Sequence, residues 1–444
     1  MATKRTPSFD SHNPATGEVA GIYPIMNAKQ VSEIVTHART ASVQWQKLGF
    51  SGRKKVLLSW SQVIINRIDQ IAALISLETG KPVGDAKLEV SIAVGHIGWA
   101  ARHAEEIMRT AYRAPGLLLS NMSATVQRSP LGVVGVIGPW NYPMFTPVGS
   151  ITYALAAGNT VVFKPSEYTP GVGMWLEETF NEVAPFADVL TTITGLGETG
   201  GALCTSGVDK ISFTGSTRTA KIVAAQCATT MTPVVLECGG KDPVIVAVDA
   251  NLERAVDATI WSAMANAGQS CIGAERVYVD ERVADKFVEL AVQLAKTIHA
   301  GAPGEGNYGP ATMPSQIKVI QSHIKSAIKD GGRCAYGGPE SVKPPFVQPV
   351  ILLDVPEDSA AMREETFGPT IIINRVKSMR EAIDLSNASS YGLGANVWSK
   401  RQGKKIAAEL ACGMVAINST FSFAAVASVP FGGVKDSGYG RVHG

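Results

Sequence analysis

The sequence predicts an α/β protein with a doubly wound parallel sheet, a second α/β domain and a small arm. The chain has 444 residues, more than one hydrophobic core usually organises, so two or three domains are expected. Hydrophobic residues make up 45% and charged residues 18%, which supplies a large interior. From Leu131 onward, short β-branched runs alternate with segments long enough for helices, a pattern that is typical of parallel sheets.

Helical patterns dominate the N-terminal quarter of the chain. Apolar residues recur at helical spacing from Asn27 to Leu48, from Ser51 to Thr79 and from Asp85 to Thr110. Gly80 is the expected end of the second helix, because glycine commonly follows a helix C-terminus.

Two sets of strand candidates follow. The first set predicts the doubly wound sheet and consists of Val133–Ile137, Thr160–Phe163, Val189–Ile193, Lys210–Phe213 and Val234–Leu236. The second set predicts the second α/β domain and consists of Pro243–Val248, Arg276–Val279, Thr370–Ile373 and Met414–Ile417. The short polar segment Ser123–Arg128 is expected in an arm outside both domains. A doubly wound sheet indicates a nucleotide-binding half.

Charge and composition exclude several classes of protein. The formal net charge is +2, and the densest basic cluster is Arg53, Lys54 and Lys55, which we interpret as a solvated helix face. A nucleic-acid partner would need a basic stripe or patch. The segment from Met1 to Pro14 is polar and lacks the apolar core of a secretory signal, so we expect a cytoplasmic protein without a membrane partner.

The cysteines and histidines predict reduced thiols and no metal site. The seven histidines show no HxxxH or Cys/His ligand spacing. No CxxC pair occurs among the six cysteines, which are Cys204, Cys227, Cys238, Cys271, Cys334 and Cys412.

Two glycine-containing motifs could hold a phosphate. Gly195–Gly200 matches GxGxxG, but glycines at strand-to-helix turns are common for steric reasons alone, so this signal is weak. Phe213–Thr217 closes a strand and opens a helix, whose backbone N–H groups and Ser216 hydroxyl could face a phosphate. The alternative is that Ser216 is an ordinary N-cap.

Lys164-Pro165-Ser166-Glu167 ends an apolar strand at the edge where open α/β sheets bind ligands. A carboxylate at that edge can accept hydrogen bonds from a ribose diol. The alternative is a solvated ion pair at a strand end.

Cys271 is a candidate nucleophile. A free cysteine is most often a small core residue, but Gly268 and Gly273 are expected to leave room here for a substrate. Glu237 ends an apolar strand, and buried glutamates are rare without a partner or a role; an ion pair with Lys241 is the structural alternative. A thiol with a carboxylate base is a workable pair for acyl chemistry.

Seven motifs carry a resemblance to the aldehyde dehydrogenase superfamily in order and spacing. They are Pro139-Trp140-Asn141-Tyr142-Pro143, Lys164-Pro165-Ser166-Glu167, Phe213-Thr214-Gly215-Ser216-Thr217, Leu236-Glu237-Cys238-Gly239-Gly240-Lys241, Gly268-Gln269-Ser270-Cys271, Glu364-Glu365-Thr366-Phe367-Gly368-Pro369 and Pro430-Phe431-Gly432-Gly433. The resemblance covers nearly the whole chain, from Asn13 to Arg441.

The resemblance implies a role for each matching position. Cys271 resembles the nucleophile that adds to the aldehyde, Asn141 and the Cys271 backbone N–H resemble the oxyanion hole, and Glu237 resembles the base that activates water against the thioester. The implied NAD(P)-binding positions are Trp140 and Ser216 with Gly215 at the pyrophosphate, Lys164, Ser166 and Glu167 at the adenosine ribose, and Glu365 and Phe367 at the nicotinamide. NAD is the expected cofactor and NADP the alternative, because a carboxylate at Glu167 would repel a 2′-phosphate.

The resemblance also implies a domain organisation and a homo-oligomer. The expected Rossmann-like cofactor domain comprises residues 1–110 and 131–239, the oligomerisation arm residues 111–130, and the catalytic domain residues 240–430. Residues 431–444 are expected to return to the cofactor domain or the arm.

Two departures from the family pattern stand out. Ala220 occupies the position one turn after Ser216 where glycine is usual, which is expected to tighten packing near the pyrophosphate. The sequence given ends at Gly444 where the family usually continues into a strand that joins the arm, which puts subunit assembly in doubt.

Three functions remain open. The first is oxidation of an aldehyde with water as the acyl acceptor, which Glu237 favours. The second is an acylating enzyme that passes the acyl group to coenzyme A, and the third is a cofactor-binding structural protein without turnover. The uncharged positions Tyr142, Met144, Phe145, Ile272 and Ser419–Ser428 favour an apolar or aromatic aldehyde.

Overall fold

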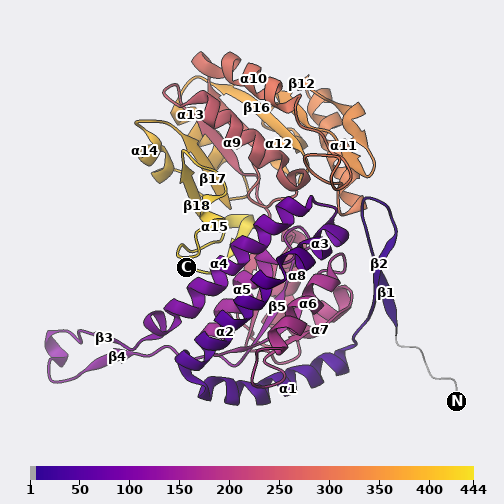
Figure 1. Ribbon diagram of the computed structural model, residues 1–444. Coiled ribbons are helices and arrows are strands. Elements are labelled where there is room, and N and C mark those ends of the chain that lie inside the picture. Colours follow the sequence, from indigo (N-terminus) through magenta and orange to yellow (C-terminus); the bar gives the residue numbers. More distant parts are fainter. Residues whose placement is uncertain (1–6) are drawn as a thin grey trace.

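The computed structural model describes residues 7–444, which form two α/β bodies, each built on its own sheet (Figure 1). Both sheets consist mainly of parallel strands. The predicted α/β class is therefore confirmed.

The first sheet has the strand order β19-β9-β8-β5-β6-β7. All neighbours are parallel except β19, which pairs antiparallel with β9. The chain enters at the central β5, adds β6 and β7 on one side, and then returns to add β8 and β9 on the other, so the winding reverses beside β5. The strands are β5 (Val133–Ile137), β6 (Thr160–Lys164), β7 (Leu190–Thr192), β8 (Lys210–Thr214), β9 (Val234–Glu237) and β19 (Gly438–Tyr439).

Helices cover both faces of this sheet. On one face, α5 and α6 pack on the strands, and α2, α3 and α4 form an outer layer over them. On the other face, α1, α7 and α8 share a second apolar cluster. The helices are α1 (Ala28–Lys47), α2 (Gly49–Asn66), α3 (Ile68–Thr79), α4 (Val83–Met108), α5 (Phe145–Ala157), α6 (Pro170–Asn181), α7 (Gly197–Cys204) and α8 (Thr217–Ala228).

The predicted single helix over Ser51–Thr79 is wrong, because the chain breaks it into α2 and α3 at Arg67. Arg67 leaves helical geometry with φ −116° and ψ 25°. Its guanidinium binds both carboxylate oxygens of Glu182, at 2.7 and 2.8 Å, just beyond the end of α6. The apolar spacing continues through the break, so the sequence pattern alone does not locate it.

The second sheet has the order β12-β15-β16-β11-β10-β17-β18, with only β12 antiparallel to its neighbour. Helices α9 and α10 cover one face, and α11, α12, α13 and α14 the other. The strands are β10 (Pro243–Val246), β11 (Arg276–Asp280), β12 (Arg333–Tyr336), β15 (Val350–Leu353), β16 (Thr370–Val376), β17 (Gly394–Trp398) and β18 (Met414–Ile417); the helices are α9 (Leu252–Met264), α10 (Glu281–Ala295), α11 (Pro314–Lys329), α12 (Ala360–Arg363), α13 (Met379–Asn387) and α14 (Gly403–Ala408).

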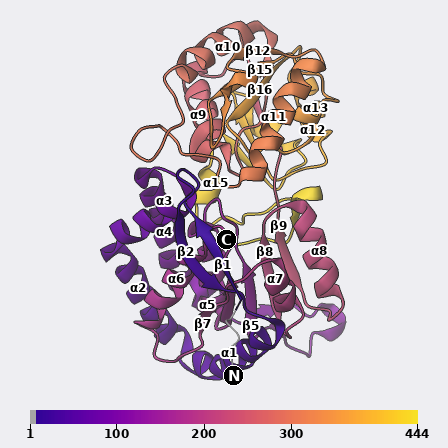
Figure 2. The same ribbon diagram turned by 90° about the vertical axis from the view of Figure 1, so that its right-hand side faces the viewer.

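Smaller elements complete the fold. The hairpin of β1 (Ser8–His12) and β2 (Val19–Pro24) lies along the first body, and β13 (Val342–Lys343) pairs with β14 (Phe346–Val347). Helix α15 (Ser422–Ala425) and the segment that follows it lie between the two bodies (Figure 2).

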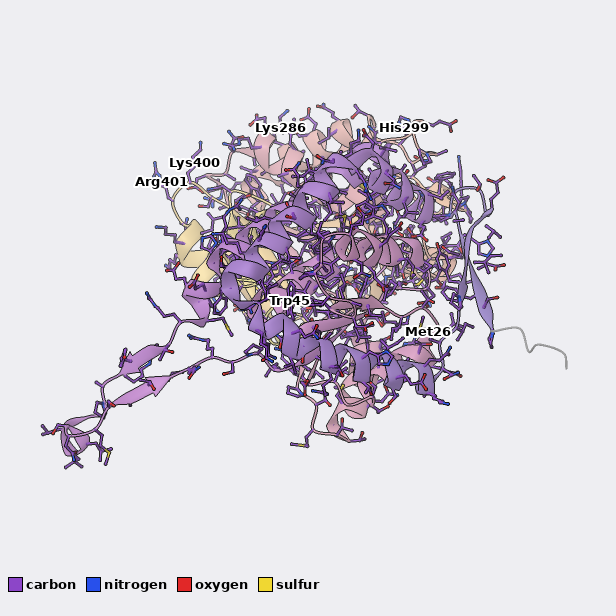
Figure 3. All side chains as sticks on the ribbon, turned by 60° about the horizontal axis from the view of Figure 1, so that its bottom comes forward. Met26, Trp45, Lys286, His299, Lys400 and Arg401 are labelled. Carbon is purple, nitrogen blue, oxygen red and sulfur yellow. The ribbon has the colours of Figure 1, made fainter. Side chains whose placement is uncertain are left out.

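The arm is a two-stranded hairpin that projects from the first body (Figure 3). Strand β3 (Ala111–Arg113) pairs antiparallel with β4 (Ala124–Val126), which lies inside the predicted segment Ser123–Arg128. At its tip, Leu117 and Leu118 are 91% and 96% exposed. The arm therefore presents apolar side chains that the fold of this chain leaves uncovered.

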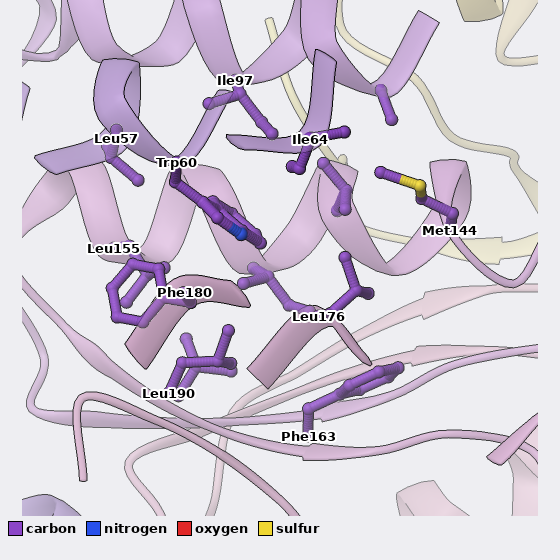
Figure 4. Close-up of a cluster of buried hydrophobic side chains, with 14 of the residues drawn as sticks. Leu57, Trp60, Ile64, Ile97, Met144, Leu155, Phe163, Leu176, Phe180 and Leu190 are labelled. Atoms are coloured by element: carbon purple, nitrogen blue, oxygen red, sulfur yellow. The ribbon is translucent and has the colours of Figure 1, made fainter. Parts of the chain in front are cut away.

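The core of the first body links its outer helices to the sheet (Figure 4). Trp60 is fully buried, lies edge-on to Phe180 at 5.3 Å between ring centroids, and donates from its indole nitrogen to the Thr179 hydroxyl at 3.1 Å. Met144, which follows β5, belongs to the same cluster. The segment after β5 is therefore anchored in the largest apolar core of this body.

None of the helices among residues 7–444 combines the length and the apolar character needed to cross a membrane.

Replacing Trp60 with Ala should lower the free energy of unfolding of the first body by about 3–5 kcal/mol, because it removes a fully buried ring and leaves the Thr179 hydroxyl without its donor. Urea unfolding followed by circular dichroism measures the change. The control is Met174→Ala on α6, where the side chain is 39% exposed and a change within about 0.5 kcal/mol is expected. Equal effects of the two substitutions would contradict this account of the core.

Candidate active site

The parallel strands of the first sheet bring four predicted site segments to one edge. Lys164 is the last residue of β6 and Glu237 the last of β9, while Gly215 directly follows β8. Asn141 follows β5, the strand at which the winding reverses. Carboxyl ends beside such a reversal form the usual ligand crevice of open α/β sheets.

Cys271 comes from the second body, in the turn between a short 3-10 segment (Ala265–Gly268) and β11. Asn266 and Ala267 adopt left-handed φ values of 54° and 58°, and Gly268 follows with 68°. Left-handed φ values are costly at Asn266 and Ala267, whereas glycine adopts them readily. The turn that follows places Cys271 in the wall of a cavity that residues of the first body also line.

The expectation that Gly268 and Gly273 leave room for a substrate is wrong. A Cβ on Gly268 would collide with the Gly368 backbone, and one on Gly273 would lie 3.1 Å from the Ser270 carbonyl oxygen. These glycines permit close approach of backbone to backbone. Gly240 acts in the same way, because a Cβ there would lie 2.8 Å from the Cys271 carbonyl oxygen.

The Asn141 side chain is buried and points toward the Cys271 turn. Its amide nitrogen donates to the Gln269 carbonyl oxygen at 2.9 Å. An amide NH₂ group carries two hydrogens, so one donor remains beyond this contact.

Cys271 and Glu237 line one cavity of about 410 Å³ between the two bodies. The aromatic side chains in its wall are Tyr142, Phe145, Trp261, Phe421, Phe431 and His443. Burial and neighbouring His96 lower the pKa of His443 to about 4, so this imidazole is neutral at physiological pH.

The Cys271 thiol and the Glu237 carboxyl group both favour their protonated forms. Burial raises the pKa of the Cys271 thiol well above its ordinary value, and the negative charges of Glu237, Glu365 and Asp242 add to that effect. Burial also raises the pKa of Glu237 well above its ordinary value, with Asp242 adding to the shift and Arg441 opposing it.

The alternative of an ion pair between Glu237 and Lys241 is wrong. Lys241 binds the Glu275 carboxylate and donates to the Thr366 hydroxyl at 3.1 Å. Glu237 is 2% exposed, and its Oε1 has no hydrogen-bond partner within residues 7–444. A buried polar atom without a partner is costly, so this carboxyl group adds no hydrogen bond from Oε1 to the stability of the fold.

Glu365 lies beside the end of β9. Its carboxylate accepts from the Gly240 N–H at 3.0 Å, and a Cβ on Gly239 would collide with it. Burial and the charge of Glu275 raise the pKa of Glu365 to about 8. Phe367 packs edge-on against Trp140, with 5.6 Å between ring centroids. These contacts bring the predicted nicotinamide-side positions next to the sheet edge.

Lys164 is 4% exposed, so the alternative of a solvated ion pair is wrong for this residue. Its ammonium donates to the Pro165 carbonyl oxygen at 3.0 Å and lies 3.8 Å from the partly exposed Glu167 carboxylate. The Ser166 hydroxyl accepts from the Tyr168 N–H at 3.3 Å. Burial lowers the pKa of Lys164 and Glu167 opposes that shift.

Ser216 is the N-cap of α8, as one of the two alternatives predicted. Its hydroxyl accepts from the Thr219 N–H at 3.3 Å while the side chain remains exposed. Ala220 is 2% exposed and packs in the apolar cluster beneath α8. Gly195 has φ 150° and a Cβ there would collide with Thr199, so steric demand explains the first glycine of the GxGxxG match.

Three charged residues that sequence motifs did not single out hold these segments in place. Glu275 accepts hydrogen bonds from the Thr366 N–H at 2.9 Å and the Phe367 N–H at 2.9 Å, and the other two, Lys81 and Glu89, contact the segment after β5. The only sequence signal for Glu275 is its position directly before the buried strand β11. Residues 7–444 contain no cluster of three potential metal ligands.

The comparisons with known proteins agree with this arrangement. The sequence matches the Aldehyde dehydrogenase family over residues 1–444. It is 34% identical over 436 residues to 4,4'-diapolycopene aldehyde oxidase of Methylomonas sp, covering 97% of this chain and 82% of that protein. It is 37% identical over 435 residues to glutarate-semialdehyde dehydrogenase of Pseudomonas putida, covering 97% and 89%. An aldehyde dehydrogenase from Bacillus cereus, solved as an NAD+ complex, superposes with a TM-score of 0.93 at 31% identity, covering 99% of this chain and 90% of that one. This protein belongs to the aldehyde dehydrogenase family.

Proposed function

We propose that this enzyme oxidises an apolar or aromatic aldehyde to the carboxylic acid with NAD(P), through a thioester on Cys271. The observation that carries the proposal is that the Cys271 thiol shares a cavity with the Glu237 carboxyl group, whose Oε1 has no hydrogen-bond partner within residues 7–444. A nucleophile and a potential base in one buried cavity suit acyl chemistry at a thiol.

The residues at the sheet edge fit a dinucleotide. The buried Lys164 ammonium and the partly exposed Glu167 carboxylate could bind ribose hydroxyls at the end of β6, and the exposed N-terminus of α8 at Ser216 could face the pyrophosphate. When bound, NAD(P) supplies the acceptor for the hydride. The Glu167 carboxylate favours NAD, since a 2′-phosphate would place a second anion beside it.

The side chains of this chain account for the remaining steps. The Cys271 thiol first gives its proton to solvent, because its raised pKa keeps it protonated in the free enzyme. The thiolate then adds to the carbonyl carbon, and the oxygen that becomes negative receives hydrogen bonds from the Asn141 amide and the Cys271 N–H. After hydride has left the same carbon, a thioester remains. In its carboxylate form, Glu237 takes a proton from water as that water attacks the thioester. The carbon–sulfur bond breaks, the proton passes to the departing sulfur, and the acid and the Cys271 thiol are released.

The cavity wall supports the substrate class. The only lysine or arginine among the described lining residues is Lys81, which already pairs with Glu89 at 2.7 Å. Asp85, Glu89 and Glu237 contribute acidic groups. A second carboxylate on the substrate would therefore find no free lysine or arginine among the described lining residues.

We also propose that residues 1–110 and 131–239 act as the cofactor domain, residues 240–430 as the catalytic domain and residues 111–130 as an arm for homo-oligomer assembly. The exposed leucines at the tip of the arm support the last assignment. The free cysteines among the described residues support a reducing, cytoplasmic location.

The direct test measures NADH formation with benzaldehyde, hexanal and succinate semialdehyde, with and without coenzyme A. We expect turnover without coenzyme A, higher kcat/KM for the first two aldehydes, and no turnover in Cys271→Ala, which lacks the nucleophile. The control is Cys334→Ala, whose thiol is exposed on the second body. An absolute requirement for coenzyme A would favour the acylating alternative, and no turnover with any aldehyde would favour the structural one.

Replacing Glu237 with Gln should slow hydrolysis of the thioester more than hydride transfer, because the amide cannot accept the proton of water. A pre-steady-state burst of NADH should then appear or grow in stopped-flow absorbance. Equal slowing of the burst and of the steady-state rate would contradict the proposed role of Glu237 in thioester hydrolysis.

Alkylation of the free enzyme should show the raised pKa of Cys271 directly. Because a raised pKa leaves little thiolate at neutral pH, the rate with iodoacetamide should keep rising up to pH 9, by about tenfold per pH unit. The rate in Cys271→Ala is subtracted to remove the other thiols. A rate that becomes constant below pH 8 would contradict the raised pKa.

A further inference from the structure

A fully buried ion pair lies behind the Asn141 segment. Lys81 follows α3, Glu89 lies on α4, and the ammonium and carboxylate are 2.7 Å apart with both side chains about 1% exposed. Neither side chain belongs to a motif that carried the family resemblance.

Each member of the pair also binds the backbone that carries Asn141. The Lys81 ammonium donates to the Asn141 carbonyl oxygen at 2.7 Å and lies 4.4 Å from the centre of the Tyr142 ring. The second carboxylate oxygen of Glu89 accepts from the N–H groups of Met144 at 2.9 Å and Phe145 at 3.1 Å. The pair therefore forms hydrogen bonds with the backbone at both ends of the segment 141–145.

The Asn141 segment is held from the Cys271 side as well. Asn266 donates from its side chain to the same Asn141 carbonyl oxygen at 3.0 Å, and the Asn141 amide donates to Gln269. Gln269 in turn accepts from the Thr312 N–H at 2.8 Å. One hydrogen of the Asn141 amide remains, and its direction depends on where the backbone of Asn141 lies.

Stability alone is a weak reason for burying two charges here. The desolvation cost of a buried ion pair often equals or exceeds the attraction, and apolar residues of similar volume often stabilise a fold as well or better. What apolar residues could not provide is a donor for the Asn141 carbonyl together with an acceptor for two successive N–H groups.

We propose that Lys81 and Glu89 are positioning residues for the oxyanion hole. They fix the backbone on both sides of Asn141, so that its remaining amide hydrogen meets the oxygen of the adduct on Cys271. The inference rests on the proposed role of Asn141. Because a misplacement of about 1 Å can cost 10²-fold in rate, loss of the pair should lower kcat strongly.

The test compares Lys81→Met, Glu89→Gln and Asn141→Ala, alone and combined, with benzaldehyde and NAD. Lys81→Met keeps most of the length of the side chain and removes the donor, whereas Glu89→Gln keeps one acceptor and removes the charge. The control is Lys87→Met on α4, the helix that also carries Glu89. The Lys87 ammonium pairs with Asp69 at the surface. Circular dichroism and NAD binding establish that each variant is folded.

Asn141→Ala should lower kcat by about 10²-fold, and Lys81→Met and Glu89→Gln by about 10-fold or more, with KM for both substrates within about twofold. In the Asn141→Ala background, Lys81→Met should cost less than about threefold, because the group that it positions is already gone. Lys87→Met should leave kcat unchanged.

Two results would overturn the inference. One is an unchanged kcat in both single variants; if Lys81→Met fails to fold, the result with Glu89→Gln decides. The other is an equal loss with and without Asn141, which indicates a general structural role. An unchanged kcat in Asn141→Ala would instead contradict the proposed oxyanion hole itself.

Discussion

The parallel alignment of β5, β6, β8 and β9 is the constraint on which the site depends. Asn141, Lys164 and Glu237 reach one edge of the sheet because each follows, or ends, a strand that points to that edge. The second body places the turn that carries Cys271 at that edge. It does so through three successive left-handed residues, Asn266, Ala267 and Gly268, whose conformation the surrounding hydrogen bonds of Asn266 and Gln269 maintain.

Electrostatics divides the buried acids into two groups. Glu275 and Glu89 each pair with a lysine and accept backbone N–H groups, so their charges are satisfied and they hold segments in place. Glu237 lacks such a lysine, and burial favours its protonated form. A lysine partner thus offsets the cost of burying the charge of Glu275 and of Glu89, whereas Glu237 has no such compensation.

The sequence predicted most of what local pattern controls. The bounds of β5 and β18 agree with the predicted strands. Glu237 and Cys271 were singled out because a carboxylate at a strand end and a thiol between glycines are unusual. The break at Arg67 coincides with an ion pair to Glu182, which is 115 residues away. Strand β17 contains Gly394, Ala395 and Asn396, which are poor strand formers. Gly268 was recognised for the wrong reason, since the Gly368 backbone that demands it lies on another segment. Such contacts are set by tertiary structure.

The antiparallel pairing of β19 with β9 has a consequence for biosynthesis. The Ser437 hydroxyl donates to the Gly239 carbonyl oxygen across 198 residues of sequence, and Ser437 also accepts from the Cys238 N–H. The sheet of the first body therefore lacks its last strand, β19, until the whole second body has been translated. During that interval β9 is an uncovered edge strand, the kind of surface at which unfinished chains associate. A ribosome-bound chain of this enzyme thus leaves the strand that ends in Glu237 unpaired on one side until β19 has been made.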